Sequence, residues 1–358
     1  MKVAVIGAGI VGLSTANWLK RYGQDVTLFD REDPGSQASF GNAGTYAKYA
    51  NIPTNSSSFF YLFPYLLLNK NSPLFFKRGK FIQSLPWLMQ YLSNCRQSKV
   101  TDTSNKLTTL LSLVDEGYED LFNDADIENL ISRESIFYVW SNKLFYNSAR
   151  KDFETREKTG VKIEIISKNE INDVEPNINN IFYKGALFKG SYFAKNPKKI
   201  SEKLLQLFIE KGGNFKKEKI EEIKILDTNK VNIHTNENTY IYDRIVLCAG
   251  VWSKKLTDKL GENIPLASER GYHLMYPHPE NSISRPIAWQ ERGVYFTPMQ
   301  DGLRAGGVVE LGGNSNEISS KVVSYLKRAT EAVFPNINNH LSEWVGFRPS
   351  VPDSLPVF

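Results

Sequence analysis

The hydrophobic pattern of the first thirty residues predicts a strand, a tight turn, a helix and a second strand. Residues 2–6 (KVAVI) form a mainly apolar run with β-branched side chains, which is typical of a parallel strand buried on both faces. Apolar side chains recur at helical spacing over residues 10–22, and Gly23 is a suitable helix stop. A second apolar run, residues 26–29, ends in Asp30. This order of elements indicates a βαβ nucleotide-binding unit.

The turn of this unit carries the pattern Gly-x-Gly-x-x-Gly, at Gly7, Gly9 and Gly12. The first glycine allows the tight turn, the second lets a pyrophosphate approach the backbone, and the third lets the helix pack closely on the strand. The helix N-terminus presents N–H groups and its positive dipole end to phosphates. Asp30 can accept hydrogen bonds from ribose hydroxyls. We therefore expect an ADP moiety here, which could belong to FAD or to NAD.

The remaining chain mixes helical and strand-like patterns. Helical patterns cover residues 81–95, 107–122, 149–160, 196–213 and 319–334, and strand-like patterns cover 136–140, 143–146, 182–193, 214–243, 244–248 and 269–307. Pro197 at a first helical position and a Ser167–Glu170 capping box strengthen two of the helix starts. Asp301-Gly302 is a favourable hairpin turn.

A buried strand is expected again at residues 244–248, followed by the small residues Ala249 and Gly250. The return of βα character after a long excursion predicts a discontinuous domain with a second domain inserted into it. We expect an α/β, Rossmann-like nucleotide domain and an inserted α+β substrate domain with a mostly antiparallel sheet. The predicted boundaries are 1–50, 195–262 and 335–358 for the nucleotide domain, and 51–194 and 263–334 for the substrate domain.

Composition agrees with a two-domain globular protein of 358 residues. Hydrophobic residues make up 41% and aromatic residues 12%, enough for a large core or an aromatic-lined pocket. The formal net charge of +5 is small and, taken over the whole chain, too diffuse to indicate a nucleic-acid partner. Two cysteines without a C-x-x-C pair fit a reducing compartment, and four histidines without paired-ligand spacing make a metal site unexpected.

The apolar stretch at residues 59–68 contains a proline and is too short to span a bilayer. It could be a core helix, an interaction face or a shallow contact with a membrane surface. The apolar run after Lys2 is explained by the glycine motif rather than by a signal peptide. We therefore expect a cytoplasmic protein, with peripheral contact to the inner face of the membrane as one alternative.

Several motifs together resemble the FAD-dependent D-amino-acid oxidase superfamily, and within it the bacterial D-amino-acid dehydrogenases. The matching segments are VAVIGAGIVGLSTANWL (3–19) with Asp30, SFGNAG (39–44), IVLCAGVWS (245–253), ERGYH (269–273), YFTPMQDGLRAGG (295–307) and VGFRPSVPD (345–353). Their order and spacing cover nearly the whole chain, so the resemblance to the family is specific. The resemblance to one substrate is not.

The resemblance implies non-covalent FAD, with its ADP half on the first βαβ unit. The residues implied are Gly7, Ala8, Gly9, Ile10, Val11, Gly12, Asp30 and Arg31 in that unit, Ser39, Asn42 and Ala43 beside the pyrophosphate and flavin, Ile220 at the adenine, and Ala249, Gly250 and Trp252 against the cofactor. Trp252 could instead be a core residue. Cys248 is interpreted as a packed strand residue rather than a redox thiol.

On the substrate side the resemblance places Arg348 at the position of a carboxylate clamp, and guanidinium groups bind carboxylates in bidentate fashion. Tyr272, His273 and Tyr295 are further candidates, with ordinary sheet packing as the alternative for each. The implied reaction is oxidative deamination, in which a hydride passes from Cα to flavin N5 and the imino acid hydrolyses to a 2-oxo acid and ammonia. The electron acceptor implied is oxygen, or a quinone or other carrier.

Members of the family continue past the segment ending at residue 353 into a further strand and a helix start that covers the flavin. We therefore expect this chain to be truncated at its C-terminus, as a fragment or as a truncated gene product. A sarcosine- or glycine-type enzyme and a 2-hydroxy-acid oxidoreductase are alternatives, because Arg348 suits any of their carboxylates. An inactive, truncated FAD-binding remnant is the alternative outside the enzymes.

Overall fold

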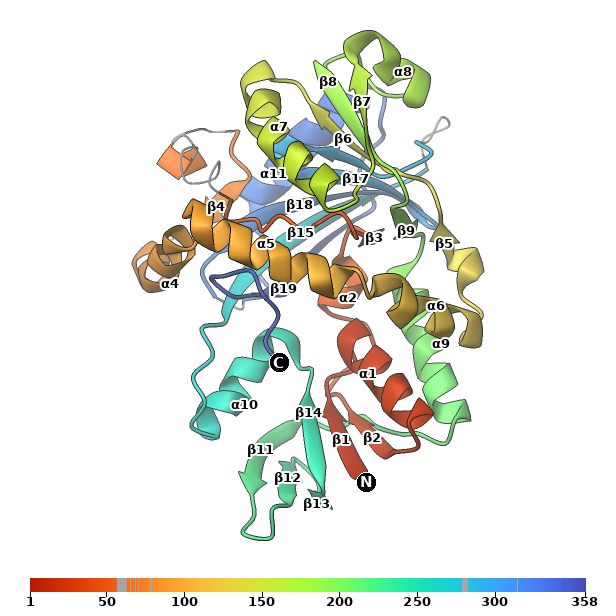
Figure 1. The fold of residues 1–358 in the computed structure, drawn as a ribbon, viewed down its shortest axis with the longest axis vertical. Coiled ribbons are helices and arrows are strands. Elements are labelled where there is room, and N and C mark those ends of the chain that lie inside the picture. Colours follow the sequence, from red (N-terminus) through yellow and green to blue (C-terminus); the bar gives the residue numbers. More distant parts are fainter. Residues whose placement is uncertain are drawn as a thin grey trace. The chain divides into compact units, whose positions relative to one another are not determined.

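The computed structural model describes residues 1–56, 63–64, 66–67, 69, 71–77, 79–278, 283–313 and 315–358. Within these residues the chain forms two compact units, each built from three stretches of sequence (Figure 1). Unit 1 contains Met1–Phe40, Asp115–Leu130 and Pro197–Ala267, and unit 2 contains Gly41–Val114, Ile131–Asn196 and Ser268–Phe358.

Unit 1 is built on a parallel sheet in the order β10-β2-β1-β14. Its elements are β1 (Lys2–Ile6), α1 (Ile10–Arg21), β2 (Asp25–Phe29), α6 (Val114–Asp124), α9 (Pro197–Glu210), β10 (Asn214–Lys216), β14 (Arg244–Leu247) and α10 (Ser253–Lys259), with short 3-10 turns at Glu128–Leu130 and Gly250–Trp252. An antiparallel sheet of β11 (Ile220–Ile225), β12 (Val231–Thr235) and β13 (Thr239–Tyr242) completes the unit. Helix α1 is joined to α9 by buried Asn17, whose Nδ2 donates to the Leu204 carbonyl oxygen at 2.9 Å.

Unit 2 is built on a large mixed sheet in the order β19-β15-β18-β17-β16-β6-β8-β7, with β4 beside β18. These strands are β4 (Leu74–Phe76), β6 (Ile136–Trp140), β7 (Ile163–Ser167), β8 (Lys184–Phe188), β15 (Ala267–Tyr276), β16 (Ile287–Trp289), β17 (Val294–Met299), β18 (Gly302–Leu311) and β19 (Ser342–Ser350). A smaller sheet joins β3 (Thr45–Tyr46), β9 (Tyr192–Ala194) and β5 (Ile131–Ser132). Most of the pairings are antiparallel, as expected.

The helices of unit 2 are α2 (Ala38–Gly41), α4 (Phe81–Ser93), α5 (Gln97–Leu111), α7 (Lys143–Lys158), α8 (Ile171–Val174) and α11 (Ser320–Val333), with 3-10 turns at Lys168–Glu170 and Gln290–Arg292; α2 begins in unit 1. The main core lies where α11 meets the large sheet, and includes fully buried Phe296 and Leu326. Apolar side chains at i, i+3 and i+4 along α11 make this packing possible.

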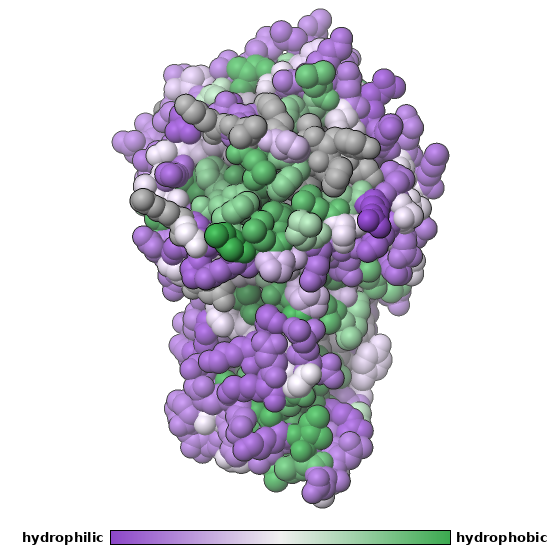
Figure 2. Space-filling view, turned by 90° about the vertical axis from the view of Figure 1, so that its left-hand side faces the viewer, coloured by the Kyte–Doolittle hydropathy of each residue, from purple (hydrophilic) through white to green (hydrophobic). Residues whose placement is uncertain are grey.

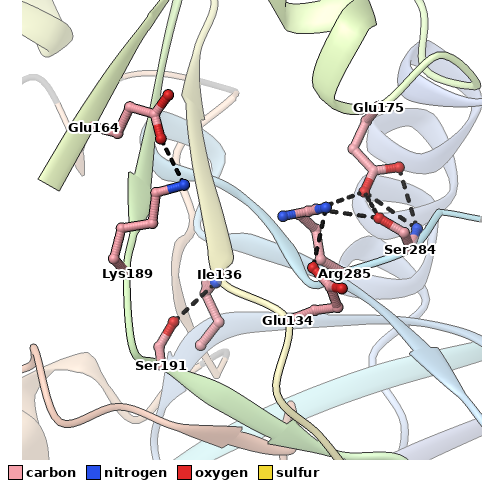
Figure 3. A network of polar contacts seen from close by, with 8 residues as sticks. All are labelled: Glu134, Ile136, Glu164, Glu175, Lys189, Ser191, Ser284 and Arg285. Carbon is pink, nitrogen blue, oxygen red and sulfur yellow. Dashed lines mark hydrogen bonds and ion pairs between the residues drawn. The ribbon is translucent and has the colours of Figure 1, made fainter.

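A polar network lies where the neighbouring strands β6 and β16 of this sheet begin (Figure 3). Glu175 is 1% exposed and accepts hydrogen bonds from the Ser284 hydroxyl at 2.6 Å and from Arg285 Nε at 3.1 Å. Arg285 also pairs with Glu134 at 3.1 Å. Nearby, the Ile136 N–H donates to the Ser191 hydroxyl at 2.9 Å. The network holds the chain at the start of β6 because a buried carboxylate is stable only when it is paired.

The predicted fold class is confirmed, but three stretches belong to the other unit than predicted: residues 41–50, 115–130 and 335–358. Residues 115–130 belong to unit 1, because Trp18 Nε1 donates to the Gly117 carbonyl at 3.1 Å and Arg21 pairs with Asp120 at 2.8 Å. Residues 335–358 belong to unit 2, because β19 pairs with β15 in the large sheet.

Some local predictions were wrong because a helix N-cap or the pairing register of a hairpin determines the structure there. Residues 143–146 begin α7 instead of forming a strand, because the Asn142 side chain caps that helix by accepting from the Leu144 N–H at 2.8 Å. The predicted turn at Asp301-Gly302 lies one residue earlier, since Met299 and Gly302 face each other across the hairpin. The strand-like pattern predicted over residues 214–243 corresponds to four separate strands. The apolar stretch 59–68 lies mostly outside the described residues.

Candidate cofactor and substrate site

The glycine turn of unit 1 has the close packing predicted for it. Gly7 has a φ of +107°, and its N–H donates to the Phe29 carbonyl at 2.7 Å. A Cβ built on Gly12 would lie 1.7 Å from the Gly7 carbonyl oxygen, so α1 can approach β1 only without a side chain there. The protein's own packing therefore explains the first and third glycines.

Gly9 is different, because little protein surrounds the space that its side chain would fill. Among the described residues, a Cβ at Gly9 would have one neighbour within 4 Å, the Ser39 hydroxyl at 3.2 Å. The same hydroxyl accepts a hydrogen bond from the Ile10 N–H at 2.9 Å, and exposed Val11 follows in the first turn of α1. Packing does not require glycine here, whereas close approach of a phosphate to this helix N-terminus does.

Asp30 lies at the end of β2 and is held by the glycine turn. Its carboxylate accepts hydrogen bonds from the Ala8 N–H at 2.6 Å and from the Glu32 N–H at 3.0 Å. Burial raises the pKa of Asp30, while these two N–H groups act in the opposite direction. Each oxygen retains a lone pair that can accept a ribose hydroxyl.

The remaining predicted residues of unit 1 follow β2, β10 and β14. The Arg31 guanidinium lies 4.1 Å from the centre of the Trp252 ring, so Trp252 carries a cation–π contact rather than serving only as core. Ile220 and Ala249 pack against the same apolar cluster, and Gly250 begins a 3-10 turn with a φ of +55°.

Cys248 lies close to the glycine turn, where its Cβ would be 3.3 Å from a Cβ on Gly12. Burial raises the pKa of its thiol, partly offset by a hydrogen bond with Thr15. This supports the interpretation of Cys248 as a packed residue, since reactive cysteines have lowered pKa values.

In unit 2 the loop that contains Asn42 and Ala43 is fastened by side chains from three neighbouring strands. The carbonyl oxygens of residues 41, 42 and 43 accept hydrogen bonds from His273 Nδ1 at 3.1 Å, Arg304 Nη1 at 2.8 Å and Thr297 Oγ1 at 3.0 Å, respectively. Three successive carbonyls are thus directed toward the sheet.

The anchoring of these carbonyls also sets the direction of the loop's N–H groups. In a trans peptide the C=O and the following N–H point in opposite directions, so the N–H groups of Asn42 and Ala43 point away from the anchoring side chains. The Asn42 side chain accepts from the Gly44 N–H at 2.7 Å and stabilises the bend. The loop is therefore fixed on the sheet through its carbonyls, and its N–H groups lie on the opposite side.

Arg304 and Thr297 were missed in the reading of the sequence. The sequence feature that could have identified them is a polar side chain in each of two otherwise apolar strands. Both side chains are buried, with exposed fractions of 5% for Arg304 and zero for Thr297. Buried polar groups need partners, but the sequence does not show that these partners are carbonyls more than 250 positions away.

His273 supports this loop from a buried position. Its ring stacks on Trp344, with ring centres 5.0 Å apart and an angle of 14° between the planes. Burial, and secondarily the positive charge of Arg304, lower the pKa of His273 to about 3, so the ring is neutral at physiological pH. A carbonyl oxygen can only accept, so Nδ1 carries the proton given to Gly41.

Tyr272 points to the other face of β15, as alternation along a strand requires. Its hydroxyl donates to Glu310, which also pairs with the fully buried Arg270. Burial raises the pKa of Tyr272, and Glu310 adds to this effect. The predicted substrate candidate Tyr272 is therefore committed to a buried network.

Arg348 lies on β19 and is held at two backbone carbonyls. Its Nη1 donates to the Val308 carbonyl at 2.9 Å and its Nη2 to the Gly307 carbonyl at 3.4 Å. Val308 has a φ of +54°, a strained conformation for a β-branched residue that re-aims these carbonyls. The guanidinium covers Gly271, where a Cβ would lie 2.7 Å from Cζ.

Arg348 is exposed to solvent and carries charge next to a partly buried acid. The surrounding protein lowers the pKa of Arg348 by desolvation, and the charge of Glu269 opposes this effect. Burial raises the pKa of Glu269, and Arg348 lowers it. A guanidinium has five N–H donors, so its bonds to two carbonyls leave donors for a carboxylate.

Tyr295 is the predicted residue that the structure brings into range of Arg348. It lies near Arg348, and its hydroxyl is 3.0 Å from that of Tyr138. Burial raises the pKa values of Tyr295 and Tyr138 well above the usual range, and Tyr138 also bonds to Tyr49. The hydroxyls of these tyrosines therefore stay protonated and can act as neutral donors.

A parallel sheet with this turn and terminal acid defines a dinucleotide-binding α/β protein. The family model described as FAD dependent oxidoreductase (DAO) matches residues 2–358, and the chain belongs to this family of FAD-dependent oxidoreductases. A D-amino-acid oxidase of Bradyrhizobium diazoefficiens is 28% identical over 362 residues, which cover 99% of this chain and 86% of that protein.

Solved structures show the same fold. Glycine oxidase from Geobacillus kaustophilus matches with a TM-score of 0.75 and 16% identity, over 99% of this chain and 85% of that one. L-proline dehydrogenase from P. horikoshii matches with a TM-score of 0.72 and 15% identity, over 99% and 83%. The residues fit the FAD of the family, because the space at Gly9 faces a helix N-terminus and Asp30 retains acceptor positions.

Proposed function

We propose that this FAD-dependent oxidoreductase oxidatively deaminates amino acids, with D-amino acids favoured, and yields a 2-oxo acid and ammonia. The similarity to a protein named D-amino-acid oxidase supports the substrate class and the preferred configuration. When bound, FAD would supply the redox chemistry as the two-electron acceptor for the substrate's Cα hydride. Gly7, Gly9, Gly12, Asp30 and the other residues implied by the resemblance are proposed to hold the cofactor.

Arg348 is the observation that carries the proposal. A solvent-accessible guanidinium, held at two carbonyls and covering a glycine, is ready to receive a carboxylate without first being ordered. Its planar donors match a carboxylate in bidentate geometry and so fix the substrate's direction as well as its position. An oriented substrate is the main contribution that the protein makes when a cofactor carries the chemistry.

Tyr295 is proposed as a second contact to the substrate. Its hydroxyl remains protonated because burial raises its pKa, so it can donate a hydrogen bond without adding charge. We propose a different role for His273 and Tyr272. His273 positions the loop that carries Asn42, and Tyr272 stabilises the sheet through Glu310.

We propose that a quinone or another carrier receives the electrons, at a peripheral site on the inner face of the membrane. Among the described residues no helix is both long enough and apolar enough to cross a bilayer. The apolar character of residues 59–68 supports the peripheral site, as a sequence property. Comparing reoxidation of the reduced flavin by oxygen and by a soluble quinone tests the acceptor, and a rapid reaction with oxygen alone would contradict it.

The substrate class is tested by mixing the FAD-loaded protein anaerobically with D- and L-amino acids, sarcosine and 2-hydroxy acids while following flavin absorbance. We expect D-amino acids to bleach the flavin fastest. Faster bleaching by sarcosine or by a 2-hydroxy acid would assign the enzyme to that class. A protein that retains no flavin absorbance after FAD is added and unbound FAD is removed would be the inactive remnant.

Arg348→Lys tests the clamp, because lysine keeps the charge and loses the bidentate geometry. We expect kcat/KM to fall by about thirtyfold or more, while FAD remains bound, since weakening a charged pair of this kind costs about 2–5 kcal/mol. Arg328→Lys, on an exposed position of α11, is the matched control and should behave as wild type. Unchanged turnover in Arg348→Lys would contradict the clamp.

A further inference from the structure

Helix α4 is a surface helix without a single charged residue. Its sequence is FIQSLPWLMQYLS, whereas the outward face of a surface helix is normally charged. Ile82 is 77% exposed and Met89 is 65% exposed, and exposed Pro86 lies between them at helical spacing. We call these three residues the apolar face of α4. Leu88 and Tyr91 point inward and are buried. The helix therefore packs one apolar face against the protein and exposes a second one to water.

Figure 2 shows the side of the molecule on which α4 lies, and apolar side chains gather there. Phe81, at the start of the helix, is 40% exposed and continues the apolar face toward the N-terminal end. Contiguous exposed apolar surface in a folded protein marks a site of interaction rather than chance. The nature of the partner follows from the charges around the helix.

The positive charge of the chain is concentrated in the stretch of sequence that contains α4, although Lys77 of this stretch pairs with Glu317 at 3.2 Å. Residues 34–101 contain no aspartate or glutamate, and contain seven basic residues: Lys48, Lys70, Lys77, Arg78, Lys80, Arg96 and Lys99. In the rest of the chain 37 basic residues face 39 acidic ones, so that part is slightly negative. The entire positive excess therefore lies in the segment that contains the apolar helix.

The basic residues stand at both ends of the helix. Lys80 immediately precedes α4, and Arg96 and Lys99 follow it, and all three are exposed. Lys80 contacts Gln83 at 3.0 Å and Lys99 contacts Asn94 at 3.1 Å, both neutral partners, so these contacts do not cancel the charges. An apolar face with cations at its ends matches the boundary between lipid chains and anionic headgroups.

We propose that the apolar face of α4 docks on the surface of an anionic lipid bilayer, with Lys80, Arg96 and Lys99 at the headgroups. A helix of 13 residues is about 20 Å long and cannot span the hydrocarbon layer, so it lies in the interface. A second copy of the chain is a poorer partner, because a two-fold contact would bring the same basic segment against itself. This inference deepens the proposed peripheral membrane site by naming its docking surface, and it can fail independently of the proposed amino-acid oxidation.

The test is flotation of the FAD-loaded full chain with vesicles of phosphatidylcholine alone and with an equal amount of phosphatidylglycerol. We expect binding to the anionic vesicles only, weakening as salt is raised. The double variant Ile82→Asp/Met89→Asp should bind at least about tenfold more weakly, since it replaces two apolar contacts by charges that anionic lipid repels. Unchanged flavin absorbance and unfolding temperature would show that this variant folds.

The matched control is Leu144→Asp/Ile165→Asp, which adds the same charge at exposed apolar positions of α7 and β7. It should bind the anionic vesicles as wild type does, and equal losses in the two double variants would overturn the proposal. So would equal binding to neutral vesicles, or a wild-type dimer that the α4 variant dissociates without any vesicle binding. A protein that binds vesicles but oxidises no amino acid would contradict the proposed function and leave this inference standing.

Discussion

Replacing the buried imidazole of His273 by asparagine should make the protein less sensitive to mild acid. The ring is 1% exposed and its pKa is lowered to about 3, so the folded protein keeps it neutral at pH 5. The unfolded chain, with an ordinary histidine pKa of about 6.5, takes up a proton at that pH. Stability that is present above the unfolded pKa is therefore lost as the pH falls from about 6.5 toward 3.

The size of this loss follows from the two pKa values. Between pH 7 and pH 5 the unfolded chain becomes protonated over about 1.5 pH units, and each unit is worth about 1.4 kcal/mol, so His273 alone lowers the free energy of unfolding by about 2 kcal/mol. His273→Asn can still donate from Nδ2 to the Gly41 carbonyl and does not titrate. The fall in stability between the two pH values should therefore be about 2 kcal/mol smaller in the variant.

Urea unfolding at pH 7 and pH 5, followed by tryptophan fluorescence and by circular dichroism, measures this difference. His278→Asn, which removes an exposed histidine, is the control and should show the wild-type fall. An identical fall in wild type and in His273→Asn would refute the reasoning, because it would mean that His273 takes up a proton equally in both states. The transitions seen by the two probes must coincide for the comparison to hold, since the chain forms two units.

Three further predictions concern other parts of the molecule. Gly9→Val should weaken FAD binding by at least about tenfold, measured by flavin fluorescence, with the free energy of unfolding unchanged. Gly12→Ala should instead lower the free energy of unfolding by about 3 kcal/mol through overpacking. A similar loss of stability in both variants would contradict the distinction. Glu175→Ala should lower the free energy of unfolding by about 3 kcal/mol, because Arg285 loses a buried partner. A change below about 1 kcal/mol in urea unfolding would argue that the network does not stabilise the fold. Tyr295→Phe should raise KM by about fivefold to tenfold at unchanged FAD affinity, since one neutral hydrogen bond is worth about 1 kcal/mol, and an unaltered KM would remove Tyr295 from the substrate contacts.

Much of the nucleotide-binding unit could be predicted from the sequence because its contacts are local. The pairing of Ala8 with Asp30 spans 22 positions, and the clash that requires Gly12 is with Gly7. Strand, turn and helix preferences all act within this short stretch and agree with one another. Boundary errors arose where a single hydrogen bond decides, as at Asn142, whose cap turns a strand-like pattern into the first turn of α7.

The candidate substrate side could be predicted only in part. Arg348 was selected because a motif contains it, but its two carbonyl partners depend on the strained backbone at Val308, which no residue type announces. Tyr272 and His273 are adjacent in the sequence, and both were predicted to be candidate substrate contacts. The pleat of β15 sends one into the network with Glu310 and the other to the loop at Gly41.

The sequence by itself determined the family, its FAD cofactor and the α/β class, because short-range patterns and motif spacing contain that information. Only the tertiary structure decided that three consecutive carbonyls are held by side chains 232, 254 and 262 positions away. It also decided that α4 turns uncharged residues toward water. Both depend on which strands and helices become neighbours, and that follows from the packing of the whole chain rather than from any one segment.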